Sequence, residues 1–289
     1  MSLAAGTVVT YPAGAVRSVG TVLHVADAGE GRLAVILDRT AFHPVDSAWP
    51  DQPADRGSLR TAAGESVVLD AVVGATRGEG IVLGPDVPVR TGTDGWTFFV
   101  AHLVDGAATV SVGDSAEVTV DAAYRGALSA GHTACHLASL ALDAALADSW
   151  RKEAPADALG APAFDALAIQ DSRILPDGSR DVYRIGKSLR RRGFDPDGLG
   201  DLDALAARVN AQLAAWIAAG GIVRIERDGD ALADRRTWVC ELPGAEARIP
   251  CGGTHVASLG ELSAVTVAFE ASPVEGGVEL VMTTTVGRA

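Results

Sequence analysis

Apolar and polar residues alternate in short runs through the first 120 residues. In Ala116–Val120, for example, Ala and Val alternate with Glu and Thr. Other runs rich in Val, Thr, Leu and Phe are mostly separated by glycines; they are Thr7–Tyr11, Val16–Val25, Arg32–Leu37, Ser66–Val73, Trp96–Leu103 and Ala108–Val112. Short strands at this spacing, with no long helical pattern between them, are typical of a small β-barrel or curled sheet.

The period of the pattern changes near residue 130. Leucines and alanines then follow helical spacing, which predicts a helix from about Gly131 to Trp150. A second helix is predicted from about Leu202 to Ala219, with Gly220-Gly221 ending it. Strands return in four later runs, at Ile222–Arg227, Arg236–Glu241, Ala264–Ala271 and Val278–Val286.

These patterns predict an α+β fold. An N-terminal β-barrel is followed by a core in which helices pack on a mostly antiparallel sheet. The strand pattern gives way to the helical one between residues 121 and 128. We therefore predict two domains, residues 1–125 and residues 126–289.

The composition agrees with a folded chain. With 289 residues, 48% hydrophobic and 21% charged, the chain is long enough for one large domain or two modest ones and is not disordered. The longest apolar stretch, Ala211–Val223, is too short to span a bilayer, and Met1–Pro12 has no basic residue ahead of its apolar run. Three cysteines cannot close a disulfide framework. The sequence therefore predicts a cytoplasmic protein, without a membrane partner, whose thiolates are available for metal.

The net charge limits the partners. A formal charge of −13 argues against a protein that coats nucleic acid by charge alone. One local exception stands out, the basic cluster Lys187, Arg190, Arg191 and Arg192. This cluster is interpreted either as a contact with RNA or as a solvated loop or helix end.

Two short motifs carry candidate chemistry. In the first, His132 and His136 are four residues apart on a predicted helix, so both imidazoles lie on one face, one turn apart. In the second, Cys251 and His255 are also four apart, with Gly252 and a further glycine between them to let the backbone fold tightly. Borderline-soft Zn²⁺ prefers such nitrogen and sulfur ligands, so the four residues are candidate zinc ligands.

Each motif also has a structural interpretation. The histidine pair could be two helix-terminal residues satisfied by the backbone, and the second motif could be a glycine-rich turn with a buried thiol. Cys135, inside the first motif, and Cys240, which alternates with Trp238, are expected to be buried residues rather than ligands.

At these residues the sequence resembles the alanyl-tRNA editing family, which comprises the editing domain of alanyl-tRNA synthetase and its free-standing relatives. The family carries an HTATH-type helix start and a later CGGTH loop, which read here His132-Thr133-Ala134-Cys135-His136 and Cys251-Gly252-Gly253-Thr254-His255. Further matching residues cover most of the chain; they are Asp38, Thr40, Ala41, Phe42, Pro44, Gln52-Pro53, Asp55, Arg56, Gly57, Val120-Asp121, Arg125 and Asn210.

The resemblance implies a barrel followed by an editing core, with zinc held by His132, His136, Cys251 and His255. It also implies hydrolysis of the ester that joins a wrong amino acid to tRNA, with the aminoacyl-tRNA as partner. Thr133 matches a family threonine linked to recognition of a hydroxylated amino acid, and Gln52 is expected to help line the pocket.

The chain departs from the family pattern in four places. His43 replaces a tyrosine, Cys135 replaces the second threonine of HTATH, and Ala48–Asp51 replaces a glycine run in a loop about three residues longer. The Arg-rich segment Asp181–Phe194 does not clearly reproduce an RFDF stretch. Glycines in this loop would let the substrate approach the backbone, so replacing them with Trp and Pro is expected to reshape the pocket. The aminoacyl group of the substrate is therefore expected to be serine or an unusual, threonine-like amino acid.

The resulting prediction is a trans-acting, zinc-dependent aminoacyl-tRNA deacylase. The chain has no GxxxxGK[ST] phosphate loop, and 289 residues are too few for an additional activating domain. Two alternatives stay open: a metal-dependent hydrolase of a small ester or amide that does not use tRNA, and a non-enzymatic RNA-binding module in which zinc only stabilises the fold.

Overall fold

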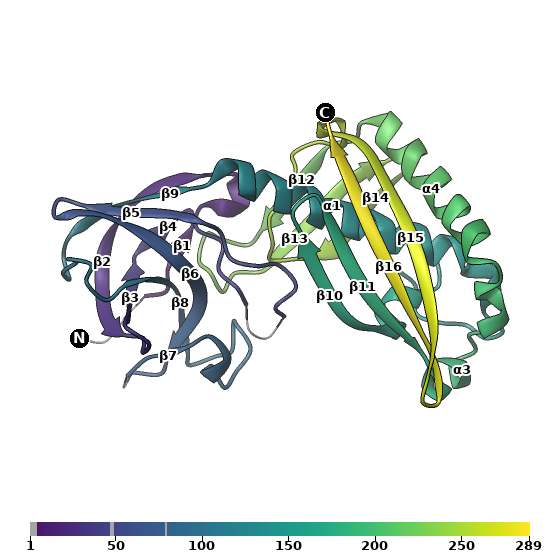
Figure 1. The fold of residues 1–289 in the computed structure, drawn as a ribbon, viewed down its shortest axis with the longest axis horizontal. Coiled ribbons are helices and arrows are strands. Elements are labelled where there is room, and N and C mark those ends of the chain that lie inside the picture. The colour runs from purple at the N-terminus through teal and green to yellow at the C-terminus, as the bar shows by residue number, and fades with distance from the viewer. Residues whose placement is uncertain (1–4, 47–48, 79) are drawn as a thin grey trace. The chain divides into compact units, whose positions relative to one another are not determined.

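The computed structural model describes residues 5–46, 49–78 and 80–289 (Figure 1). Up to residue 120 its elements are β1 (Val8–Val9), η1 (Tyr11–Ala13), β2 (Arg17–Asp27), β3 (Arg32–Leu37), β4 (Arg39–Thr40), β5 (Gly57–Thr61), β6 (Gly64–Thr76), β7 (Val82–Leu83), η2 (Gly84–Asp86), β8 (Thr97–Asp105) and β9 (Ser115–Val120). From residue 122 on they are α1 (Ala122–Ala145), η3 (Ala147–Ser149), α2 (Phe164–Ala168), β10 (Ile169–Leu175), β11 (Gly178–Ile185), α3 (Lys187–Arg191), η4 (Pro196–Leu199), α4 (Leu202–Ala219), β12 (Val223–Arg227), β13 (Arg236–Leu242), β14 (Ala245–Pro250), η5 (Leu259–Glu261), β15 (Leu262–Val274) and β16 (Gly277–Arg288).

The chain forms two compact units. The first comprises Met1–Arg125 with the later segments Ile225–Arg236 and Gly252–Thr254, and the second comprises the rest. The division therefore falls within α1, and two short segments from the second half of the sequence group with the first unit. Autonomous domains at 1–125 and 126–289 stay a prediction.

The first unit is built on a seven-stranded sheet with the order β5–β9–β2–β3–β8–β6–β7. The pairings of β2, β3, β5, β6, β8 and β9 are antiparallel. Strand β5 pairs with β9 and also with β6, so both edges of the order β9–β2–β3–β8–β6 meet the same strand. The predicted sheet-rich, mixed fold is confirmed, whereas the closed N-terminal barrel stays a prediction.

Strands β3 and β8 are buried on both faces. On β3, Val35 and Leu37 belong to the large hydrophobic cluster of the unit, whereas the alternate residues Ala34 and Ile36 belong to a smaller one. Because side chains of a strand point alternately to its two faces, a strand covered on both sides reads as a continuous apolar run. This is the pattern of Arg32–Leu37 in the sequence.

One predicted strand of the first unit is wrong. Residues 108–112 form no strand; Gly106 and Gly113 lie in turns on either side of them, and Gly113 adopts a φ of 94°. Ala108 and Val110 still pack against the hydrophobic cluster. Their apolar character therefore reflects loop packing rather than strand pairing.

The second unit contains a four-stranded antiparallel sheet with the order β10–β11–β16–β15. Helix α4 runs alongside β15 (Figure 1) and contacts it. Asn210 of α4 fastens the helix to this strand, because its amide donates to Val267 O at 3.0 Å and accepts from Val267 N at 2.7 Å. Helices packed on an antiparallel sheet are what the sequence predicts for this half.

The bounds of α4 match the predicted helix, and both ends have local causes. Asp201 accepts hydrogen bonds from the backbone N–H groups of Asp203 and Ala204, which caps the start. Gly220 ends the helix in a left-handed conformation with φ 66°. The sequence pattern did not predict β10 and β11, where charged residues interrupt the apolar runs.

Asp143 of α1 is a buried acid in the second unit, 3% exposed. Burial away from water raises the pKa of Asp143 to about 8, although Asp165 N donates to Oδ1 at 2.7 Å. The folded state therefore holds this proton more tightly than the unfolded chain, so its stabilising contribution is present at low pH and is lost as the pH rises to about 8.

We therefore expect an Asp143→Asn substitution to reduce the loss of stability between pH 5 and pH 8. The free energy of unfolding should fall with pH less steeply in the variant than in wild type, and the two slopes should differ by at most about 1.4 kcal/mol per pH unit. Urea denaturation of both proteins across this range measures it. Asp148→Asn, at an exposed position shortly after α1, is the control and should leave the pH profile unchanged. Parallel profiles for wild type and Asp143→Asn would contradict the prediction.

None of the helices in the described residues is both long and apolar enough to cross a membrane.

Candidate metal centre

The two histidines of the first motif lie inside α1. Their rings are 4.9 Å apart between centroids, one turn apart on one face, and His132 is 2% exposed. The helix begins at Ala122 and ends at Ala145, so the predicted bounds Gly131–Trp150 are wrong. Asp121 explains the early start, since its Oδ1 accepts from the backbone N–H groups of the second and third residues that follow it, both at 3.0 Å. The pair is therefore mid-helix, where the backbone is already hydrogen-bonded.

Gly131, directly before the pair, allows a close approach. A Cβ atom at this position would lie 2.4 Å from the carbonyl oxygens of Leu175, the last residue of β10, and Gly178, the first residue of β11. Because no side chain fits there, the hairpin packs directly on α1 next to His132. This contact places β10 and β11 beside the candidate site within the second unit.

Cys251 and His255 come from the segment after β14. Cys251 Sγ lies 3.3 Å from His255 Nε2. Gly252 does not adopt a left-handed conformation, and a Cβ there would meet open space. The sequence predicts that glycine is required here for a tight fold of the backbone. At Gly252 neither the backbone conformation nor the available space requires glycine.

The structure brings the four candidate ligands together. One ligand atom from each of His132, His136, Cys251 and His255 lies within 4.8 Å of all the others. Cys251 Sγ is 3.5 Å from His132 Nε2. For tetrahedral zinc, bond lengths near 2.1 and 2.3 Å give ligand–ligand separations of about 3.4–3.6 Å. The donor set and the two separations from Cys251 Sγ are therefore compatible with a metal ion such as zinc, without identifying which metal.

The environment of His136 provides a second test of whether these residues suit a metal ion. Its Nε2 atom is buried and has no hydrogen-bond partner within the described part of the chain. A buried polar atom without a partner costs about 1–3 kcal/mol. A metal ion bound to Nε2 would satisfy it, so the orphaned atom agrees with ligation.

Burial keeps the two helix histidines neutral. It lowers the pKa of His132 to about 3, and it lowers the pKa of His136 well below its usual value, with the neighbouring His132 adding to the effect. Neutral imidazole is the form that binds metal ions. The pair is therefore ready to bind a cation at neutral pH.

Thr133 contacts a candidate ligand. It is fully buried, and its hydroxyl lies 3.2 Å from His255 Nδ1 and accepts from Val256 N–H at 3.3 Å. A bond at Nδ1 fixes the ring and leaves Nε2 toward Cys251. The predicted contact of Thr133 with a substrate side chain stays a prediction.

Trp238 of β13 lies beside the candidate ligands, and the sequence pattern did not single it out as a site residue. Its fully buried ring is 4.9 Å from His136 and 5.9 Å from His255, measured between centroids. The strand alternation with Cys240 indicated an inward side chain, but nothing in the pattern indicated which residues it would meet. Apolar cover of this kind excludes water from a metal site.

Gln52 lies in the first unit and is 2% exposed. Its side-chain amide donates to Thr254 Oγ1 at 2.9 Å and accepts from Thr254 N–H at 3.0 Å. Thr254 precedes His255 in the chain. The predicted part of Gln52 in lining a substrate pocket stays a prediction.

The altered loop is described only in part. Ala48 lies outside the described residues, whereas Trp49 is 60% exposed. Burial raises the pKa of Asp51. A solvent-exposed tryptophan therefore stands where the family pattern has glycine.

The remaining cysteines lie apart from the four ligands. Cys135 Sγ is 3.5 Å from Asp181 Oδ1, and burial raises the pKa of its thiol well above the usual value, so it stays protonated. Cys240 is fully buried in the core, as expected.

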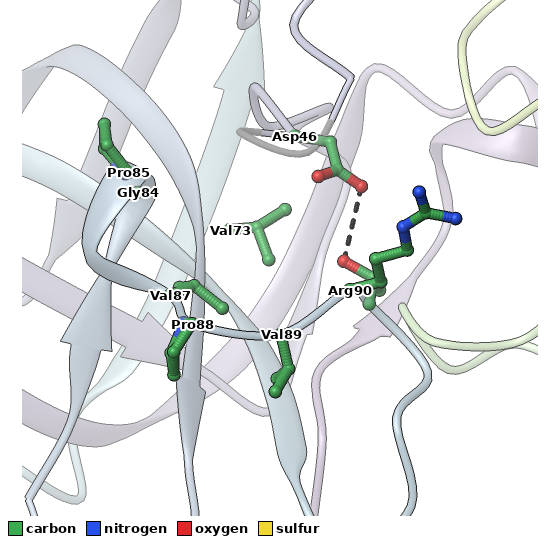
Figure 2. A pocket seen from close by; sticks show the side chains of 9 residues that line it. Asp46, Val73, Gly84, Pro85, Val87, Pro88, Val89 and Arg90 are labelled. Carbon is green, nitrogen blue, oxygen red and sulfur yellow. Dashed lines mark hydrogen bonds between the residues drawn. The ribbon is translucent and has the colours of Figure 1, made fainter.

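Two cavities lie elsewhere in the chain. One, of about 190 Å³ in the first unit, has apolar walls that include Val73, Val87 and Val89 and a rim with Asp46 and Arg90 (Figure 2). The other, a hollow of about 540 Å³ in the second unit, is lined by residues between 147 and 162. Neither is lined by a candidate ligand or by Gln52, so the expected substrate pocket is not one of these two.

The sequence of this chain is similar to that of one class of enzyme. No protein-family model matches it. It is 27% identical over 262 residues to the alanine–tRNA ligase of Cereibacter sphaeroides, covering 87% of this chain and 25% of the ligase. The identity is 30% over 247 residues to the Frankia alni enzyme, with coverage of 84% and 23%. It is 33% over 159 residues to the Ruegeria pomeroyi enzyme, with coverage of 52% and 16%.

The chain is similar to part of alanine–tRNA ligases. It spans about a quarter of the length of the first of these relatives. The similarity extends over most of this chain in the first two comparisons and therefore includes both compact units.

Proposed function

We propose that this chain is a trans-acting aminoacyl-tRNA deacylase, a hydrolase that removes a wrongly attached amino acid from tRNA. The observation that carries the proposal is the convergence of His132, His136, Cys251 and His255 within 4.8 Å. The similarity to alanine–tRNA ligases supports tRNA as the partner, and the HTATH-type and CGGTH-type motifs support editing as the reaction. The proposed domains are a β-barrel at 1–125 and a metal-binding deacylase core at 126–289.

In this proposal the four residues hold Zn²⁺. When bound, zinc supplies Lewis-acid chemistry that stabilises negative charge on an oxygen or lowers the pKa of a water molecule. The chain's own residues provide a rigid, water-poor setting: α1 presents two neutral imidazoles, Thr133 orients the His255 ring, and Trp238 covers two of the histidines. An aminoacyl ester is already activated, so a positioned water needs only modest help.

The substrate is proposed to be a hydroxylated amino acid, such as serine or a threonine-like residue. A buried polar group that loses its partner is costly, so a site with a hydroxyl-binding group can reject alanine. Thr133 and Gln52 are the proposed contacts.

The test is a deacylation panel with metal content measured on the same sample. Wild-type protein is incubated with tRNA charged with serine, threonine, alanine and glycine, and release of the amino acid is followed. We expect hydrolysis of Ser-tRNA or Thr-tRNA, with one zinc per chain and loss of activity after chelation. Hydrolysis of small esters with every charged tRNA spared would replace the proposal by a small-ester hydrolase.

One observation favours a second candidate. Four protein side chains already suffice to complete a tetrahedral zinc site, and structural zinc sites are closed in this way. A non-enzymatic, zinc-stabilised RNA-binding module would then bind tRNA and retain zinc but turn over none of the charged tRNAs. The same panel separates this outcome from deacylation.

Thr133→Val tests how the hydroxyl acts. Because Thr133 bonds to His255 Nδ1, we expect zinc affinity to fall about 10–100-fold, as for other residues that orient a ligand. If the hydroxyl also meets the substrate, the ratio of Ser-tRNA to Ala-tRNA hydrolysis changes as well. Chelator competition measures affinity, and Thr133→Ser, which retains the hydroxyl, is the control. Unchanged affinity in Thr133→Val would contradict the positioning role, and unchanged ratios would remove Thr133 from substrate recognition.

A further inference from the structure

Two segments of the second unit present exposed basic side chains. The segments are the end of η3 with the residues after it, and the stretch from β11 through α3. Both lysines of the whole chain are among the seven basic residues, which are Arg151, Lys152, Arg184, Lys187, Arg190, Arg191 and Arg192. We call these seven residues the basic surface.

Two hydrogen bonds to backbone carbonyl oxygens join the two segments. Arg151 N–H donates to Gly193 O at 2.8 Å, and Lys152 Nζ donates to Arg191 O at 3.1 Å. The first segment also lines the hollow of about 540 Å³, whose wall includes Trp150. Residues about 40 positions apart in the sequence therefore form one continuous, partly concave surface.

Some of the seven side chains are held by the fold. Arg184 Nη2 donates to Glu275 O at 2.6 Å, and Arg190 Nη2 donates to Gly276 O at 3.2 Å, both in the turn between β15 and β16. Arg151 pairs with Asp195. These bonds fix the position of the surface against the sheet.

Three of the seven side chains are not held in this way. Lys187, Arg191 and Arg192 make no side-chain hydrogen bond or ion pair within the residues that the structure describes. The three cations stand within six residues of one another on and directly after a short helix. Holding like charges this close costs energy unless an anion is bound, so their arrangement suits a polyanion.

We infer that the basic surface binds the phosphate backbone of the RNA substrate. The inference rests on the proposed function, which makes tRNA the partner. With a net charge of −13, most of the protein repels RNA, and this surface is where a phosphate backbone can approach. Guanidinium groups match phosphate oxygens with paired hydrogen bonds, and five of the seven residues are arginines.

The surface lies within reach of the candidate metal centre. Asp181 of β11 contacts Cys135, the neighbour of His136 on α1. The end of β11 at Ile185 is four residues further, about 13 Å along the strand, and α3 follows directly. One RNA molecule can therefore occupy the surface while its aminoacylated end reaches the metal centre.

The test compares two triple variants that lose the same charge. One is Lys187→Gln with Arg191→Gln and Arg192→Gln; the control is Arg173→Gln with Arg208→Gln and Arg288→Gln, three exposed arginines of β10, α4 and β16. Fluorescence anisotropy measures binding of uncharged tRNA between 50 and 200 mM salt. For the first variant we expect affinity at the lowest salt to fall at least about tenfold and the salt slope to drop by about 2–3. The control should change less than about twofold.

Equal affinity and slope for wild type and the first variant would overturn the inference, as would equal weakening of both variants. Zinc content should be the same in all three proteins, which shows that the fold is intact. The proposed function fails separately, if wild type deacylates no charged tRNA while its tRNA binding still depends on the three residues. If wild type deacylates charged tRNA but the triple substitution leaves tRNA affinity unchanged, only this inference is overturned.

Discussion

An alanine at His136 should empty the metal centre and reduce deacylation at least about a hundredfold. The substitution removes one of four clustered candidate ligands, and in the proposed function the metal would supply several kcal/mol of stabilisation to a hydrolytic transition state. Cys251→Ala should behave in the same way, because Sγ lies within 3.5 Å of nitrogen atoms of two other ligands. Metal analysis and single-turnover deacylation on the same preparation measure both effects.

Ser139→Ala is the matched control for the metal-ligand variants. Ser139 lies on the same helix, three residues after His136, and its hydroxyl donates to His136 O at 3.0 Å. It should retain metal and activity, since the backbone bond is not part of the ligand set. Full zinc stoichiometry and full activity in His136→Ala or Cys251→Ala would exclude that residue as a ligand.

Replacing Arg125 with methionine should cost about 3–5 kcal/mol in the free energy of unfolding. Arg125 is 5% exposed and forms an ion pair with Asp55, which is 2% exposed. Its Nη2 also donates to Ala41 O at 2.8 Å. Removing one partner leaves the Asp55 carboxylate buried without its main cation, and this uncompensated charge is the source of the cost.

The double variant Arg125→Met, Asp55→Leu separates charge from packing. It should recover part of the loss, because no unpaired charge remains in the core. Arg60→Met, which breaks the exposed pair with Glu65, should change stability by less than about 1 kcal/mol. Urea denaturation measures all three. A loss for Arg125→Met no larger than that for Arg60→Met would show that the buried pair contributes little.

This ion pair also explains part of the sequence pattern. Asp55 and Arg125 belong to two matched motifs 70 residues apart, and the resemblance gave no reason for either residue. In the fold they meet inside the first unit, while the neighbouring Asp121 caps α1. The helix therefore starts nine residues before the predicted position, because the capping aspartate directly precedes Ala122, in a stretch that the periodic pattern alone did not include.

The two pairs of candidate ligands, the mixed fold and the bounds of α4 follow from the sequence, because the spacing within each pair, the helical period and the alternation on strands are local properties of the chain. Strands β10 and β11 do not follow from it, because charged residues interrupt their apolar runs, and β11 pairs on its other side with β16, roughly 100 residues further along the chain. Tertiary structure alone decided that Trp238 covers the histidines, that Thr133 orients His255, and that the two basic segments form one surface. Each of these contacts joins residues distant in sequence, and a local pattern carries no information about which distant residues packing will bring together.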